Sequence, residues 1–266
     1  MLTFNSIGIG LLIFLFIIET SLIMIDDTED KKVREWMSNA LLGILFFGTI
    51  FCMRGVSLGA YSLFYHYAFI KFQLSWWLWI AGFLTCDFIN YFYHWLGHTM
   101  RIFWAAHVTH HSSEYFNISI SFRNNFIHGF YRFLFWSPLC LFGIPPEMII
   151  FFESVTGIQN YIVHTERVGK LGWMDLLFNT PSSHRVHHAT NPEYIDKNFG
   201  GMTLLFDHLF GTFAKEVAKP VYGITHNIHT QNPYRIIMHE YVHIMKEMAT
   251  IKGFANKIRY LFSPPD

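Results

Sequence analysis

Three histidine clusters carry the chemistry that this sequence can perform. They are His94-Trp-Leu-Gly-His98, His107-Val-Thr-His110-His111 and His184-Arg-Val-His187-His188. In a helix, residues at i, i+3 and i+4 project from one face, so each cluster can direct two or three imidazoles toward a single point. His164, at the end of an apolar stretch, is a ninth candidate ligand.

Nine imidazoles exceed what one metal ion can use. Structural zinc takes four protein ligands and catalytic zinc about three, so the number favours two ions. Imidazole binds iron, zinc and copper alike, so the spacing leaves the metal open. A metal pair at a membrane surface suits O₂ activation against a buried alkyl chain, which favours iron. A set of interfacial histidines without metal is the alternative, and the repetition of HxxHH beside HxxxH argues against it.

Several polar residues near the clusters are candidates to orient the imidazoles. Asp87 precedes His94 by two helical turns and is expected to accept an imidazole N–H. The other candidates are Glu114, Asn160, Glu166, Asp196, Asn198 and Asp207. For each of them, an ordinary cap or surface group is an equally open interpretation.

The composition predicts a membrane protein. Of 266 residues, 52% are hydrophobic and only 14% are charged, against about a quarter charged in soluble domains. Nineteen basic and 19 acidic side chains give no net charge and no basic patch, which excludes a nucleic-acid partner. The three cysteines, Cys52, Cys86 and Cys140, form no CxxC pair, so neither a zinc ribbon nor a disulfide framework is indicated.

The elements that must position the histidines are apolar stretches of membrane length. The runs at 6–25, 39–59 and 76–93 are each about 20 residues, enough to cross a bilayer. Residues 126–164 form two apolar segments hinged at Gly143-Ile144-Pro145-Pro146, as a hairpin or a re-entrant pair. We therefore expect an all-α integral membrane protein with about four transmembrane helices and a helical cap that holds the di-metal site. One domain is expected over 1–266, with a catalytic core at 82–216 and a C-terminal cap at 217–266.

Charge predicts the orientation. The third segment and the hairpin both end on the side where the loop 26–36 lies, and this loop carries Lys31, Lys32 and Arg34. Loops rich in Lys and Arg remain in the cytoplasm, so the histidines are expected to face it. The membrane would be the inner membrane in a bacterium and the endoplasmic reticulum in a eukaryote.

A second, weaker metal motif lies near the C-terminus. His239-Glu-Tyr-Val-His243 matches HExxH, the signature of zinc hydrolases. It falls on the solvated face of an amphipathic helix expected over 233–262, and no third ligand follows at a recognised spacing. This helix is expected to pack on the cap or to lie on the membrane. The remaining histidines are expected to have no role in the site: His66, His128, His208, His226 and His229.

The residues around the clusters resemble those of the fatty acid hydroxylase/sterol desaturase superfamily of membrane oxygenases. The runs that carry the resemblance are DFINYFYHWLGH (87–98), WAAHVTHHSSEYFN (104–117), HTERVGKLGWMDLLFNTPSSHRVHHATNPEYIDKNFGG (164–201) and FDHLFGTFAKE (206–216). They cover about half of the chain and look most like the alkylglycerol monooxygenase branch and its bacterial relatives. The chain has Asn160 where that branch tends to have Gln, and Ser183 where it tends to have His.

The resemblance implies a fold and an activity. The fold is a four-helix membrane base with a cytosolic cap that holds two iron ions, which zinc can replace on purification. The implied ligands are His94, His98, His107, His110, His111, His164, His184, His187 and His188. The family uses O₂ and two electrons to hydroxylate or desaturate a membrane lipid. The electrons come from a cytochrome b5-like or ferredoxin-like protein or from tetrahydrobiopterin.

Three other functions remain open from the residues alone. A lipid desaturase would use the same metal site, a zinc hydrolase would use His239 and His243, and a non-catalytic membrane protein would only bind metal. The oligomeric state is not predicted.

Overall fold

The computed structural model describes residues 17–18, 20–21 and 30–265. Most of the anchor predicted at 6–25 lies outside these residues. The described part is all-helical, as expected, and forms no strand. Two isolated bridges, Phe178 to Thr203 and Ala189 to Tyr222, are its only β-type pairings.

Helix α2 (Asp30–His66) contains the apolar run predicted at 39–59. Its segment Lys32–His66 is the one described stretch that is both long and apolar enough to cross a membrane, and few of its side chains are buried. An apolar helix in the core of a soluble protein would be buried, so α2 is a candidate membrane helix. The sequence leaves the aromatic stretch at 60–72 ambiguous, and its first part, to His66, continues the same helix.

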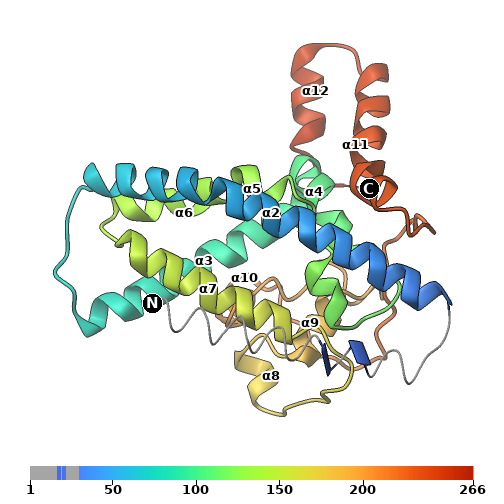
Figure 1. Ribbon diagram of the computed structural model, residues 1–266, viewed down its shortest axis with the longest axis horizontal. Helices are drawn as coiled ribbons and strands as arrows, with labels where there is room; N and C mark the ends of the chain where they lie inside the picture. The colour runs from blue at the N-terminus through green and yellow to red at the C-terminus, as the bar shows by residue number, and fades with distance from the viewer. Residues whose placement is uncertain (1–16, 19, 22–29, 266) are drawn as a thin grey trace.

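Helices α6 (Phe133–Leu141) and α7 (Pro146–Ile162) pack on α2, and α3 (Trp76–Thr99) packs on α6 and α7 (Figure 1). Their shared core comprises Tyr61, Leu78, Cys86, Trp136, Leu139, Cys140, Ile144, Met148, Ile149 and Phe152. The turn between α6 and α7 falls at the predicted hinge. Gly143 has φ 88° there, and a Cβ on it would lie 2.5 Å from the Ile70 carbonyl oxygen, so the turn requires glycine.

The first arm of this hairpin is shorter than the sequence suggested. The apolar run from 126 begins with a turn, and then α5 (His128–Tyr131) and α6 follow with Arg132 between them. Residues 128–141 extend over about 21 Å at 1.5 Å per residue, less than the hydrocarbon thickness of about 30 Å. This arm is therefore too short to cross a bilayer by itself.

Short elements gather around the histidines at one end of α2 and α3 (Figure 1). These elements are α4 (Arg101–His111), η1 (Ile118–Phe122), α8 (Met174–Leu177), α9 (Pro181–His187) and α10 (Leu205–Phe210). Long loops connect them, and many buried polar side chains hold the loops in place. The cap is thus fixed by hydrogen bonds more than by an apolar core.

The C-terminal helix predicted over 233–262 is two helices, so that prediction was wrong. Helix α11 (Pro233–Thr250) and helix α12 (Phe254–Leu261) form a hairpin, and Gly253 in the turn has φ 85°. In Figure 1 this hairpin stands crosswise to α2. Ile236 and Ile237 of α11 pack against Leu42 of α2, so α11 belongs to the cap.

Candidate metal centre

Five histidines converge from α3, α4 and α9 to form what we call the first cluster: His94, His98, His107, His111 and His187. Nε2 of His107 lies 3.1 Å from Nε2 of His94 and 3.1 Å from Nε2 of His111. Nε2 of His111 lies 3.2 Å from Nε2 of His98 and 3.1 Å from Nε2 of His187. The i, i+4 spacing on α3 and on α4 therefore places pairs of imidazoles together, as the sequence predicted.

Four further histidines form the second cluster: His110, His164, His184 and His188. Nε2 of His164 lies 3.1 Å from Nε2 of His110 and 2.9 Å from Nε2 of His184. Nε2 of His188 lies 3.2 Å from both His164 and His184. The structure thus brings all nine predicted histidines into two groups.

Neighbouring residues belong to different clusters. His110 and His111 diverge by the rotation of about 100° per residue that a helix imposes, and His187 and His188 also lie in different clusters. The ring of His111 stacks on that of His188 with centroids 4.4 Å apart. The two clusters are therefore side by side, which is the arrangement that a metal pair needs.

The outward ring nitrogens show which tautomer the structure requires. Nδ1–H of His94 donates to the Phe199 carbonyl at 2.9 Å, and Nδ1–H of His187 donates to the Lys197 carbonyl at 2.9 Å. In the second cluster, Nδ1–H of His164 donates to the Asn160 carbonyl at 2.5 Å. A carbonyl oxygen can only accept, so each of these Nδ1 atoms carries the proton and each Nε2 presents a lone pair inward.

This arrangement fits a metal pair. Nitrogen lone pairs about 3 Å apart repel one another unless a cation or a proton lies between them. Burial removes the protons, because it lowers the pKa values of six clustered histidines, and neighbouring imidazoles lower these pKa values further. The six are His107, His110, His111, His184, His187 and His188. Burial also lowers the pKa of His164 to about 3. Neutral imidazoles with converging lone pairs are the form that binds metal.

Residues 79–212, half of the chain, match the family described as fatty acid hydroxylase. The chain belongs to this family. The match confirms the resemblance drawn from the sequence, and all nine clustered histidines fall within it. No solved structure matches the chain significantly.

Curated relatives of this fatty acid hydroxylase family member act on lipids according to their names. It is 40% identical to human alkylglycerol monooxygenase over 73% of this chain and 44% of the relative. It is 35% identical to the alkylglycerol monooxygenase of Danio rerio over 90% of this chain and 54% of the relative. It is 28% identical to ornithine lipid hydroxylase OlsE of Rhizobium tropici over 62% and 51% of the two chains. The chain thus spans about half the length of the relatives that it matches.

The predicted orienting residues act in three different ways. Asp196 contacts a clustered imidazole directly, with Oδ1 3.2 Å from Nδ1 of His98. Asn160 acts through its backbone carbonyl, so a side chain shorter than Gln does not alter the contact with His164. Asp87 does not accept an imidazole N–H as predicted. Its carboxylate accepts from Met202 N at 2.8 Å and from the Thr203 hydroxyl at 2.5 Å.

Asn198 and Asp207 hold the loop that supplies the carbonyl acceptors. Asp207 accepts from the backbone N–H groups of Phe199 and Gly200, both at 2.8 Å. Asn198 donates to the carbonyls of Ser183 and Ala214 and accepts from Ala214 N. Both residues therefore orient His94 and His187 only through the backbone at 197–200.

The ion pairs and hydrogen bonds of Glu166 and Glu114 involve no clustered histidine. Glu166 accepts from the hydroxyl of Tyr222 at 3.1 Å. Glu114 lies 3.0 Å from Nδ1 of His229 at the surface. The prediction that these carboxylates orient imidazoles is therefore not supported by their contacts.

Helix α9 is held by two devices that the sequence analysis missed. Thr180 and Ser183 form a capping box, in which the Ser183 hydroxyl accepts from Thr180 N at 2.8 Å. This gives Ser183 a structural role. Arg185 ion-pairs with Glu216 through Nη2 to Oε2 at 2.7 Å. The S/T-x-x-S pattern is a visible cap signal, whereas nothing in the sequence pairs Arg185 with a residue 31 positions away.

Two other buried residues near the clusters were also missed. Arg123 donates from Nε to the Thr109 carbonyl at 3.1 Å and from Nη2 to the Ser112 carbonyl at 3.3 Å, so it caps the end of α4. His128, expected to have no role, is buried with its ring centroid 6.1 Å from that of His107. Its Nδ1 accepts from the Tyr131 hydroxyl at 3.1 Å, so it supports the wall of the site and is not a tenth ligand.

The alternative motif, HExxH, does not form a comparable site. His239 is half-buried, and not on a fully solvated face as predicted, and its Nδ1–H donates to the Ile236 carbonyl at 2.9 Å. Among the described residues, the groups of three or more convergent ligands include neither His239 nor His243. A catalytic zinc ion needs about three protein ligands, so this motif lacks a site.

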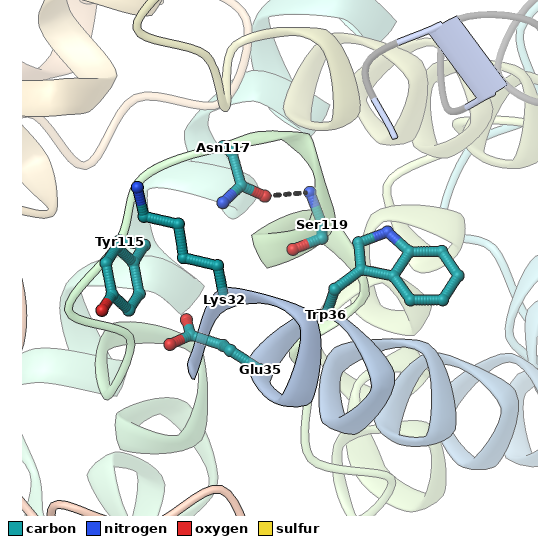
Figure 2. Close-up of a pocket in the computed structure, with 6 residues that line it drawn as sticks. All are labelled: Lys32, Glu35, Trp36, Tyr115, Asn117 and Ser119. Atoms are coloured by element: carbon teal, nitrogen blue, oxygen red, sulfur yellow. Dashed lines mark hydrogen bonds between the residues drawn. The ribbon is translucent and has the colours of Figure 1, made fainter. Parts of the chain in front are cut away.

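Two hollows border the segment 114–119, which follows α4. Figure 2 shows the smaller, of about 10 Å³, between the start of α2 and the segment with Tyr115, Asn117 and Ser119. It can hold one water at most. The larger, of about 630 Å³, is open and lined by polar groups that include Glu114, Glu166, Lys219 and Asn227.

Proposed function

We propose that this protein is a membrane-bound, O₂-dependent lipid monooxygenase whose two histidine clusters hold two iron ions. The observation that carries the proposal is the convergence of nine Nε2 atoms in two adjacent groups, at the end of a helix of membrane length. Membership of the fatty acid hydroxylase family supports it. The names of the relatives, alkylglycerol monooxygenase and ornithine lipid hydroxylase, support a lipid substrate.

Each cluster would hold one ion. When bound, the iron pair would supply the reduction of O₂ and the oxidation of a C–H bond. The carbonyls of Phe199, Lys197 and Asn160 keep Nδ1 protonated, so that Nε2 remains available as a ligand. The buried ring of Phe199 lies 5.1 Å from that of His98, and Phe116 lies 5.3 Å from His188. These rings exclude water from the two clusters, which protects a reactive centre from side reactions.

The substrate would be an alkyl or ether lipid, a sterol or a fatty acyl chain that rises from the membrane. Oxygen inserted beside an ether oxygen would give an unstable product that separates into an aldehyde and an alcohol. The protein would cross the membrane several times with its clusters in the cytoplasm, because Lys31, Lys32 and Arg34 lie in the first turns of α2, at the end where the cap lies. Electrons would come from a cytochrome b5-like or ferredoxin-like protein or from tetrahydrobiopterin.

Lipid mass spectrometry under ¹⁸O₂ tests this function. Cells that express the wild type are expected to gain one labelled oxygen in one lipid class, or to release a labelled aldehyde if an ether is cleaved. His187→Ala should abolish the label, because it removes a ligand of the first cluster. His226→Ala, which changes an exposed histidine, is the matched control and should retain it. Loss of two hydrogens without label would identify a desaturase instead.

Two further outcomes decide against the proposal. If His239→Ala abolishes the activity and His187→Ala does not, the zinc hydrolase is correct. If purified wild-type protein contains metal but consumes no O₂ with any of the three donor classes and a lipid extract, the protein only binds metal.

A further inference from the structure

Helix α12 has an apolar face that the protein leaves uncovered. Phe254, Ile258 and Phe262 lie at i, i+4 and i+8, so they share one face, and they are 80%, 40% and 51% exposed. Lys257 and Arg259 flank this stripe on its two sides, and exposed Lys252 lies just before the helix. An aromatic stripe bordered by cations is the pattern of a helix that lies in a membrane interface.

The end of α12 is fastened where α3 ends. Arg101 N donates to the Ser263 carbonyl and Arg101 Nη2 to the Pro264 carbonyl, both at 2.9 Å. The Arg101 guanidinium also lies over the Tyr260 ring, 4.4 Å from its centroid. With 24 residues, α3 is about 36 Å long, slightly more than the hydrocarbon thickness of about 30 Å. In the multi-pass arrangement proposed above, with α3 as a further crossing, Arg101 would lie at the membrane boundary, and α12 ends at that level.

The direction of α12 also fits this location. The α11–α12 hairpin stands crosswise to α2, so that a membrane crossed by α2 would run along α12 (Figure 1). Helix α12 is the arm on the side of the membrane-length helices, whereas α11 is packed on the cap through Ile236 and Ile237. The helix thus runs along the expected membrane surface, and its apolar face is exposed and not packed against a neighbouring element.

We propose that α12 is an interfacial helix that inserts Phe254, Ile258 and Phe262 into the membrane surface and binds anionic lipid headgroups through its cations. The sequence left two roles open for one C-terminal helix, and the structure assigns packing to α11 and lipid contact to α12. Because Arg101 begins the helix that carries His107 and His111, α12 sets the depth of the cap relative to the lipid. This inference rests on the membrane location proposed above but not on the metals or the activity.

Spin labels on the full-length protein in lipid nanodiscs test the insertion. Phe254→Cys, Ile258→Cys and Phe262→Cys are each labelled in a Cys52→Ser background, since Cys52 is the exposed native thiol. Asn256→Cys, on the opposite face of α12, is the matched control. We expect the three apolar positions to collide several-fold more with O₂, relative to a water-soluble nickel chelate, than position 256 does. Equal exposure of all four labels to the nickel chelate would overturn the proposal.

Labelled Cys52 in the otherwise unchanged protein separates this failure from failure of the membrane location. A lipid-immersed Cys52 with water-exposed α12 labels would refute only the interfacial helix, whereas a water-exposed Cys52 would refute the crossing of α2.

The contribution of charge is tested with Lys257→Glu/Arg259→Glu in nanodiscs with and without phosphatidylglycerol. Anionic lipid should draw the label at position 258 deeper into the membrane and so raise its ratio of O₂ to nickel-chelate collisions several-fold. The double variant should lose this effect. No effect of phosphatidylglycerol on the parent protein would overturn anionic lipid binding.

Discussion

Replacement of Glu216 by Gln should destabilise the cap, because it removes the charge that balances buried Arg185. The side chains of Arg185 and Glu216 are 7% and 11% exposed. Nε and Nη2 of Arg185 donate to the two carboxylate oxygens at 3.1 and 2.7 Å, and the Ser182 hydroxyl donates at 2.6 Å. Burial alone would raise the pKa of Glu216, but these hydrogen bonds and the charge of Arg185 hold it below its usual value. The carboxylate is therefore ionised at neutral pH.

The expected cost is about 3 kcal/mol. Removal of one partner of a buried ion pair costs about 3–5 kcal/mol, because the other charge is left without compensation. The lower value applies because Arg185 Nη1 still donates to the carbonyls of Thr165 and Val168, at 3.1 and 2.7 Å. For a chain of this size, about 3 kcal/mol corresponds to a fall in Tm of about 6–12 °C.

Thermal unfolding in detergent, with a chelator present, measures this fall without a contribution from metal. Glu193→Gln is the matched control, because Glu193 is exposed in the same cap, and its effect should stay within about 0.5 kcal/mol. Metal content should fall as well in the Glu216 variant, since Arg185 lies in α9 between His184 and His187. If Glu216→Gln and Glu193→Gln unfold at the same temperature, the ion pair of Arg185 with Glu216 does not stabilise α9.

Two further predictions concern the histidines. Asp196→Asn should weaken metal affinity about tenfold. This is the lower end of the range for a lost orienting carboxylate, because Asp196 is 53% exposed. Chelator competition measures the affinity, and an unchanged value would contradict the role of Asp196. Burial lowers the pKa values of His107, His111 and His187, so below about pH 6.5 the unfolded chain binds protons that the folded chain does not. The free energy of unfolding of the metal-free protein should therefore fall as the pH drops below that value, and a flat Tm profile would show that these imidazoles are not buried neutral.

Local geometry explains what the sequence predicted well. The separations of His94 from His98 and of His107 from His111 place each pair on one helix face wherever the helix lies in the fold. The apolar length of α2 and the Gly-Ile-Pro-Pro hinge before α7 likewise depend only on nearby residues. Family membership followed from the same local runs, which the match over 79–212 confirmed.

The single helix expected over 233–262 shows how local pattern can mislead. The apolar periodicity continues through Ile251 and Phe254, although the chain turns between them at Gly253 with φ 85°. A glycine is permitted in either structure, and the packing of α11 on Leu42 and of α12 on Arg101 decides for the turn. Those two contacts join residues far apart in the chain, so no window of the sequence contains them.

By itself, the sequence determined that nine imidazoles would be available and which of them share a helix face, because helix geometry acts within four residues. Only the tertiary structure decided that they divide into five and four, since this depends on how α9 and the residue at 164 pack against α4. It also decided that Asp87 holds the 202–203 backbone while the carbonyls of Lys197 and Phe199 orient His187 and His94. A backbone carbonyl has no residue type, so its position becomes visible only when the chain has folded.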